Sequence, residues 1–189
     1  FYTYLLDTQG DTVNTWHSSW PVAMNAYLRP DSTLLYPHRS INPVMETSGV
    51  GGAFEIKDWN GNLIWSAEIS DNTYQHHHDV EPLPNGNFLA IVWENKSAQE
   101  AFQMGRVSIG NPLNAMWSPA ILEIQPVGTD EMNIVWEWHL WDHLIQDANP
   151  NLPGYGDISA HPELFNINYG VVGSFMGQPH ADWAHMNCV

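Results

Sequence analysis

Residues 79–89, Asp-Val-Glu-Pro-Leu-Pro-Asn-Gly-Asn-Phe-Leu, place a turn between two short apolar runs. The pair Asn85-Gly86 is a strong short-range hairpin signal, and in a type I′ turn both residues would take a positive φ. Residues 26–35 repeat the pattern, with a proline and a turn between two strands. We therefore predict a β-hairpin at each of these two places.

A second kind of hairpin alternates with the first. It has an apolar strand, an acidic or glycine-bearing turn and a strand that ends in tryptophan, and it occurs over residues 4–16, 54–65 and 121–138. Equivalent positions, such as Trp16 and Trp65, lie about 50 residues apart, and a repeat of two hairpins is one four-stranded blade of a β-propeller. The sequence therefore predicts an all-β chain of about 2.5 to 3 blades. A β-sandwich with accidental similarity is the alternative.

Two stretches interrupt this repeat. A loop with a short helix over residues 97–105 is expected near 94–119, and a second loop is expected near 139–181. Because a propeller closes with roughly four to eight blades, the one domain over residues 1–189 would supply about half of a ring. We expect it to be a piece of a longer protein, and we expect its open strand edges to favour a homo-oligomer.

The chain is strongly acidic. It has 5 Lys and Arg residues against 21 Asp and Glu residues, which gives a formal net charge of −16. Nucleic acid and anionic membrane surfaces are therefore unlikely partners, since both need clustered basic residues. No apolar run approaches the roughly 20 residues that membrane insertion takes, and no signal peptide is visible. Cys188 is the single cysteine, so no internal disulfide is expected.

The densest group of titratable residues comes directly before the hairpin of residues 79–89. It is Gln75-His76-His77-His78-Asp79, which we place on the innermost strand of a blade. Alternation along a strand predicts His76 and His78 on one face and His77 on the other, unless the segment is loop. Polar channel residues that bind water are the simpler interpretation. Zinc or copper is a competing one, although adjacent histidines on a strand point apart and the ligand spacing of structural zinc sites is absent.

His185 and Asn187 occupy what we interpret as the same position in the following blade. They are two residues apart, so they would share a face of an extended strand. Two consecutive blades would then direct imidazoles toward one axis.

A further group lies at the end of the last predicted strand. His139 and His143 are four residues apart, with Asp142 between them. The spacing is similar to that of a metalloprotease helix, but the glutamate that should follow the first histidine is absent. We prefer a loop at the end of a blade, with these groups at the channel mouth or bonded within the loop. Residues 49–52 are interpreted as a flexible approach to a strand, with no phosphate site.

Four motifs in order resemble the bacterial and archaeal arylsulfotransferase family. The resemblance is carried by residues 77–87, 136–144, 161–164 and 182–187. It implies a six-bladed propeller, periplasmic or exported, that moves a sulfuryl group from an aryl sulfate to a phenol without a nucleotide donor, a metal or another cofactor.

The implied mechanism proceeds through a sulfo-histidine. A channel histidine attacks sulfur, and the acceptor phenol then takes the group. By resemblance His77 or His78, together with His185 and Asn187, hold the sulfuryl group and assist proton transfer. A nucleophilic histidine and a sulfate-binding arginine are expected beyond Val189. The alternatives from other classes are a non-catalytic exported propeller that acts as a binding or scaffold module, and a histidine-rich metal-dependent enzyme.

Overall fold

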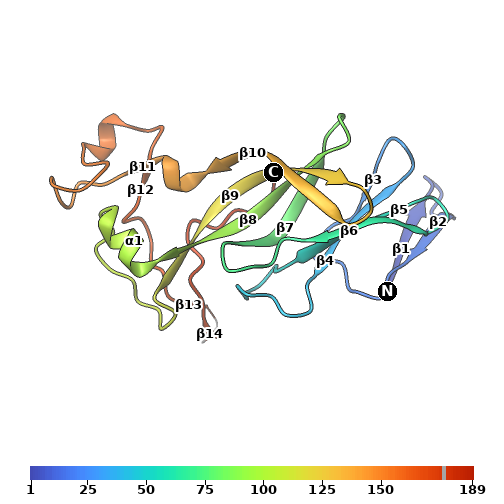
Figure 1. Ribbon diagram of the computed structural model, residues 1–189, viewed down its shortest axis with the longest axis horizontal. Coiled ribbons are helices and arrows are strands. Elements are labelled where there is room, and N and C mark those ends of the chain that lie inside the picture. The colour runs from blue at the N-terminus through green and yellow to red at the C-terminus, as the bar shows by residue number, and fades with distance from the viewer. Residues whose placement is uncertain (176–177) are drawn as a thin grey trace.

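The computed structural model describes residues 1–175 and 178–189. The chain is mostly β, with 45% strand and 7% helix; several of its sheets are antiparallel, the short pair β11–β12 is parallel, and none is closed in the part described. Figure 1 shows a long molecule with α1, β11 and β12 at one end and the hairpin β1–β2 at the other. Among the described residues, no helix is both long and apolar enough to cross a membrane.

Antiparallel hairpins build the sheets in sequence order. The first hairpin is β1 (Tyr2–Leu6) with β2 (Thr12–His17). A four-stranded sheet follows, in the order β3 (Tyr27–Leu28), β4 (Leu34–Arg39), β5 (Gly52–Lys57) and β6 (Leu63–Glu68). Another contains β7 (Tyr74–Pro82), β8 (Phe88–Ser97), β9 (Ala115–Val127) and β10 (Glu131–His139), again as neighbours in chain order. These pairings confirm the hairpins expected from both kinds of repeat.

The turn between β7 and β8 is not the type I′ turn expected at Asn85-Gly86. Gly86 takes a φ of 92°, but Asn85 does not take a positive φ. Instead the Leu83 N–H donates to the Asn87 carbonyl at 2.8 Å, and the Gly86 N–H donates to the Leu83 carbonyl at 3.1 Å. This is the pattern of a type I turn followed by a left-handed residue. The same hydrogen-bond pair closes the turns at residues 7–11, 29–33 and 58–62, with positive φ at Gly10, Ser32 and Gly61.

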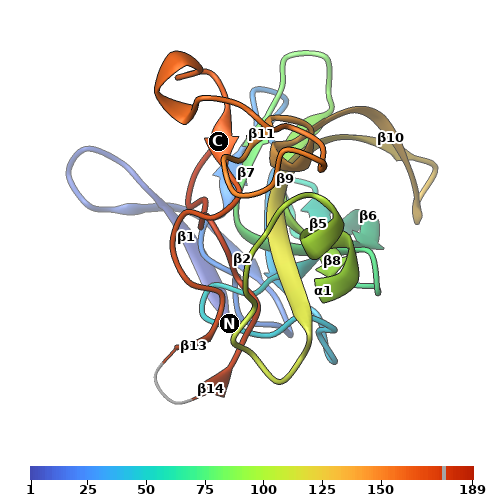
Figure 2. The ribbon, with the colours of Figure 1, turned by 90° about the vertical axis from the view of Figure 1, so that its left-hand side faces the viewer.

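The insertions emerge largely as expected. The predicted helix is α1 (Ala98–Gln103), which begins with a capping box between Ser97 and Glu100. After β10 the chain forms short elements: η1 (Leu140–Asp142), β11 (Leu144–Ile145), η2 (Ile158–Ala160), β12 (Phe165–Asn166), β13 (Ser174–Phe175) and β14 (Gln178–Pro179). Figure 2 views the molecule from the end that carries α1. Residues 176–177 of the expected loop near 139–181 lie outside the described residues.

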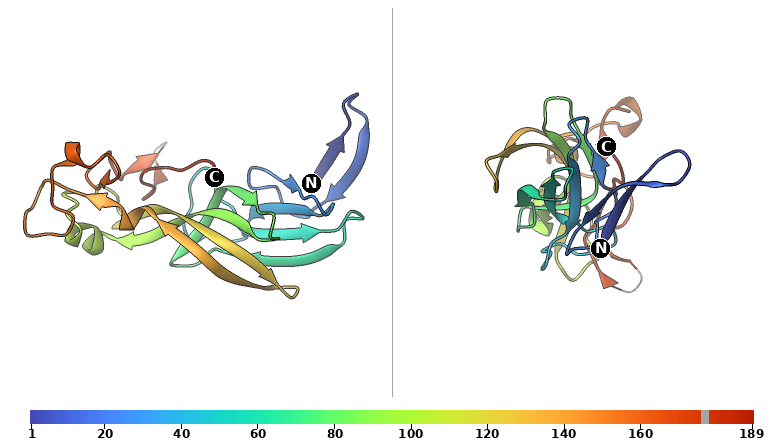
Figure 3. Two further views of the ribbon diagram at one scale, coloured as in Figure 1. Left: turned by 90° about the horizontal axis from the view of Figure 1, so that it is seen from above. Right: turned by 90° about the vertical axis from the view of Figure 1, so that its right-hand side faces the viewer.

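The main core lies between the two four-stranded sheets. Its buried side chains come from β4, β5 and β6 on one side and from β7, β8 and β9 on the other. A second core joins the far ends of β8 and β9 to α1 and the C-terminal segment, and it contains Trp93, Trp117 and Trp183. Strand β8 is buried over most of its length because both cores use it. Figure 3 shows the hairpin β1–β2, in dark blue, projecting beyond the sheets.

Two tryptophans make the same contact at successive places in the chain. The indole Nε1–H of Trp16, on β2, donates to the Asp58 carbonyl in the β5–β6 turn at 2.9 Å. That of Trp65, on β6, donates to the Glu131 carbonyl at the start of β10 at 2.7 Å. Each hairpin that ends in tryptophan is therefore tied to the next such hairpin.

Replacing Leu122 by Ala tests whether the inter-sheet core stabilises the fold. Leu122 on β9 is fully buried, so Leu122→Ala is expected to lower the free energy of unfolding by about 2–5 kcal/mol. Leu63 on β6 is 56% exposed, so Leu63→Ala is the matched control and should cost less than about 0.5 kcal/mol. Urea unfolding measures both, and equal losses would contradict this description of the core.

Candidate functional site

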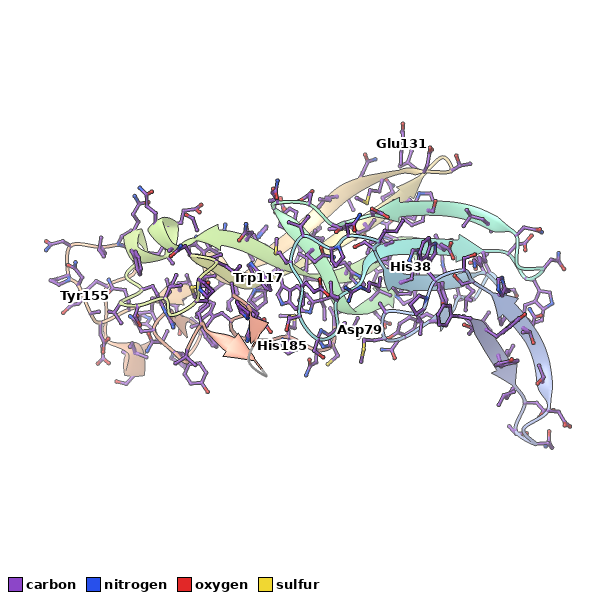
Figure 4. All side chains as sticks on the ribbon, turned by 90° about the horizontal axis from the view of Figure 1, so that it is seen from below. His38, Asp79, Trp117, Glu131, Tyr155 and His185 are labelled. Atoms are coloured by element: carbon purple, nitrogen blue, oxygen red, sulfur yellow. The ribbon has the colours of Figure 1, made fainter. Side chains whose placement is uncertain are left out.

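A pocket of about 320 Å³ opens where the start of β7 faces the C-terminal segment. Its lining consists of Thr47, Ser48, His78, His180, Asp182 and His185. Figure 4 shows His185 in the middle of the molecule, near Trp117 and Asp79. The pocket thus collects residues from three distant parts of the chain.

The backbone of β7 breaks its alternation at the histidine run. His78 takes a φ of 55°, and the pairing of β7 with β8 shifts between His76 and Val80. As a result His77 and His78 lie together, with their Nδ1 atoms 2.8 Å apart and their rings perpendicular. The expectation that His76 and His78 share a face is wrong, because a left-handed residue rotates the side chains that follow it.

His76 belongs to the core. Its Nδ1 accepts the Gly52 N–H at 3.1 Å, and its ring centroid lies 4.6 Å from that of Phe54. A Cβ on Gly51 would lie 2.3 Å from the His76 ring, so only glycine leaves room for it. Burial lowers the pKa of His76 to about 3. This histidine is a neutral structural residue rather than a ligand-binding one.

His77 is buried against the indole of Trp93 on β8. The two rings stack with centroids 4.0 Å apart and planes 8° apart. Burial, and next the neighbouring imidazoles, lower the pKa of His77 well below its usual range, with a weak opposing effect from the Val92 carbonyl. Among the described residues, its Nε2 is buried and makes no hydrogen bond of normal geometry. His77 therefore contacts the pocket through His78.

The C-terminal segment is held to the edge of β9 at Trp117. The Trp117 N–H donates to the Ala181 carbonyl at 2.7 Å, and the Trp183 N–H donates back to the Trp117 carbonyl at 3.2 Å. A parallel bridge between Trp117 and Asp182 results. This contact carries Asp182 and His185 to the histidine run of β7.

Asp182 connects the two sides of the pocket. Its Oδ1 accepts the Trp93 Nε1–H at 3.0 Å, and its Oδ2 lies 2.5 Å from Nδ1 of His185. The His185 ring centroid is 4.6 Å from that of His78 and 5.8 Å from that of His77. Burial, followed by His185, lowers the pKa of His78. The pocket therefore presents imidazoles whose Nδ1 atoms are already occupied.

The other residues of the predicted site lie outside this contact. Asp79 is buried, and its Oδ1 accepts the Tyr27 O–H at 2.6 Å and the Asn25 amide at 3.2 Å. Burial and Asp79 raise the pKa of Tyr27 to about 12. Asn187 is exposed. The roles predicted for Asp79 and Asn187 stay predictions, and the structure places Asp79 as a support between β7 and β3.

The second histidine group is not brought to the pocket. His139 lies between two carboxylates, with Nδ1 3.1 Å from Glu94 and Nε2 3.1 Å from Glu137. Since Trp93 and Glu94 alternate along β8, His139 lies on the opposite face of the sheet from His77. His143 stacks on Trp138, and Asp142 is exposed in η1. These contacts favour the interpretation that the three side chains are bonded near the end of the β9–β10 hairpin, rather than placed at a channel mouth. His139 differs from that interpretation in one respect, because its partner Glu94 lies on β8, outside the loop.

Three features of the pocket escaped the sequence analysis. Trp93 carries no local signal, because its importance comes from long-range stacking. Asp182 was visible in the motif of residues 182–187 but was not selected. The glycines of residues 49–52 were interpreted as flexible, whereas a Cβ on Gly49 would lie 2.1 Å from the His78 ring. Three glycines in four residues beside a histidine run were the available sign of close packing.

The buried histidines give the fold a pH dependence. The folded pKa of His76 is about 3 and that of His77 is also depressed, so the unfolded state binds more protons below pH ~6.5. Stability is expected to fall as pH drops from ~6.5 toward ~3, by up to about 1.4 kcal/mol per pH unit for each histidine. In His76→Gln, the free energy of unfolding should depend less steeply on pH, by up to the equivalent of one bound proton. Urea unfolding between pH 8 and pH 5 measures this slope.

The exposed His17 offers a control for this measurement. His17→Gln changes the same residue type on β2 without touching the core, so its slope should equal that of the original chain. A His76→Gln slope identical to that of His17→Gln would show that His76 is not held neutral in the fold.

One of the comparisons with known proteins identifies a family. No curated protein and no solved structure matches the chain. Within the described residues no group of three or more His, Cys, Asp and Glu side chains is arranged to hold a metal ion. The sequence model described as "Arylsulfotransferase (ASST)" matches residues 2–189. The chain therefore belongs to the arylsulfotransferase family.

Proposed function

We propose that the pocket between β7 and the C-terminal segment binds the sulfuryl group of an aryl sulfate, which is then passed to a phenolic acceptor. The observation that carries this is the meeting of His78 and His185, from motifs more than a hundred residues apart, in one pocket of a chain of this family. The pocket volume of about 320 Å³ lies in the range of small-ligand sites.

The environment suits a small anion. A sulfuryl group offers only acceptor oxygens, so it needs N–H or O–H donors. His78 lends an imidazole edge, and Thr47 and Ser48 lend hydroxyl and backbone groups. His78 and Thr47 are partly buried, which strengthens their hydrogen bonds because the local dielectric is lower than that of water, whereas Ser48 is exposed.

The chemistry would follow the two-step transfer that the family resemblance implies. In the first step a nucleophilic histidine bonds to sulfur, and the S–O bond breaks with its electron pair leaving on the phenolate. In the second step a phenol oxygen bonds to sulfur, the S–N bond breaks, and the phenol proton passes to a base. We assign His78 and His185 to binding and proton transfer. The nucleophile is expected to be another histidine, since His77 has its free nitrogen buried.

We also propose that the two four-stranded sheets are blades of a propeller. Support comes from the repeated five-residue turn and from the matching contacts of Trp16 and Trp65 with the next hairpin. Trp136, on the third such hairpin, is 48% exposed. Action outside the cytoplasm, as the resemblance implies, stays a prediction.

Substitution of His78 tests the binding role. Asn suits the left-handed backbone but cannot place a donor where Nε2 lies, so His78→Asn should weaken 4-nitrophenyl sulfate binding about tenfold to a hundredfold. Gln reaches that position with its amide, so His78→Gln should retain more affinity. Isothermal titration calorimetry measures both, with His143→Ala as the control at the remote Trp138 stack.

Turnover is measured separately on the same protein. Release of 4-nitrophenol in the presence of a second phenol would support transfer by these residues alone. Binding without release would fit both a nucleophile outside the 189 residues and the non-catalytic binding module. If the original chain and His78→Asn bind 4-nitrophenyl sulfate equally, His78 does not hold the sulfuryl group.

A further inference from the structure

Trp93 stacks on His77, which contacts His78 on one side of the pocket, and it reaches His185 on the other side through Asp182. We propose that Trp93 and Asp182 are positioning residues that fix opposite proton positions on the pocket imidazoles. His78 then presents an Nε2–H donor, and His185 presents a bare Nε2 acceptor. The use of these two nitrogens in transfer rests on the proposed function, whereas the proton positions follow from the contacts alone.

The proton on His185 is set by Asp182. One carboxylate oxygen, Oδ1, is taken by the Trp93 Nε1–H at 3.0 Å, and this orients the other toward His185 Nδ1 at 2.5 Å. An ionised carboxylate only accepts hydrogen bonds, so the proton of this contact must be on Nδ1. In a neutral imidazole the other nitrogen is then unprotonated. In its neutral form His185 therefore offers a lone pair at Nε2 to the pocket.

The proton on His78 is set by His77. Their Nδ1 atoms are 2.8 Å apart, so one nitrogen must donate and the other accept. If His78 donated, neutral His77 would carry its proton on the buried Nε2, which makes no hydrogen bond of normal geometry among the described residues, since the Val92 carbonyl acts on this ring only weakly. A buried orphan N–H is rarer and more costly than a buried bare acceptor. His77 therefore donates, and neutral His78 keeps its proton on Nε2.

Trp93 ties the two arrangements together. Its ring face stacks on His77 with centroids 4.0 Å apart, which holds the donor ring in plane, while its N–H holds Asp182. Trp93 is fully buried in the second core, so its own position is fixed. Trp93 and Asp182 can therefore determine the proton positions on the pocket imidazoles without touching a reacting atom.

The two nitrogens match the two partners of a sulfuryl transfer. A sulfuryl oxygen is an acceptor and suits the His78 Nε2–H. A phenol O–H is a donor and suits the His185 Nε2. As the phenol oxygen bonds to sulfur, its O–H bond breaks and the proton moves to His185 Nε2, while the leaving nitrogen keeps the electron pair of the S–N bond. Asp182 then faces the imidazolium, whose charge it stabilises.

The proton positions can be measured without any variant. Long-range ¹H–¹⁵N spectra of the full chain labelled on histidine, recorded at pH 7.5 without ligand, distinguish Nδ1–H from Nε2–H. We expect Nδ1–H at His185 and Nε2–H at His78. Nε2–H at His185, or Nδ1–H at His78, would overturn the proposal.

Two variants then test the cause. In Asp182→Asn the amide oxygen can still accept from Trp93 while its NH₂ donates to His185 Nδ1, so the His185 proton should move to Nε2. Trp93→Phe keeps a ring on His77 but removes the N–H, so His185 should show a mixture of both forms. Asp142→Asn, on the exposed η1, is the control and should change neither histidine. An unchanged His185 in Asp182→Asn would refute the assignment.

The affinities of Asp182→Asn for a phenol and for 4-nitrophenyl sulfate distinguish a positioning role of Asp182 from a merely structural one. Asp182→Asn should weaken phenol binding about tenfold, because His185 no longer accepts, and should not weaken 4-nitrophenyl sulfate binding. An equal loss for both ligands would indicate general damage and overturn the positioning role. If the original chain binds no aryl sulfate but shows the expected proton positions, the proposed function fails and the positioning of the protons stands.

Discussion

The left-handed backbone at His78 is the constraint on which the pocket depends. With β7 in regular pairing, His77 and His78 would point to opposite faces of the sheet. The positive φ and the shifted register bring both rings to the side of Trp93 and the C-terminal segment. Gly49 makes this conformation possible, because any side chain there would occupy the space of the His78 ring. Strain at one residue is thus stabilised by packing around it, as is common where a protein builds a ligand site.

Local signals were sufficient to predict the hairpins but not the turn type or the histidine faces. Proline, Asn-Gly and Trp positions report on short-range structure, and the strands appeared where the repeat placed them. Asn85 avoids a positive φ because a loop one residue longer lets Gly86 take the left-handed position alone. The strict alternation assumed for residues 76–78 failed because a bulge depends on the partner strand, which the local sequence does not specify.

The remaining features of the pocket depend on contacts between distant residues. His77 and Trp93 stack across paired strands, and Asp182 reaches Trp93 only because the segment around it pairs with Trp117. No periodicity encodes such a contact. His185 lies beside His78 of β7, and its role there stays a prediction. The family resemblance predicted that these residues share a site. It did not say that Asp182 orients the imidazole.

The acidity of the chain discriminates between anionic ligands by their size more than by the sign of their charge. At physiological ionic strength the Debye length is about 8 Å, so most surface carboxylates are screened at the pocket, whereas hydrogen-bond donors act at contact. Asp182 is the carboxylate in the pocket lining, and its two oxygens are occupied by Trp93 and His185. A polyanion would lie against many carboxylates at once, within a net charge of −16. A single sulfuryl group that enters a cavity of about 320 Å³ meets mainly imidazole and hydroxyl groups. The charge that disfavours nucleic acid is therefore compatible with a small aryl sulfate.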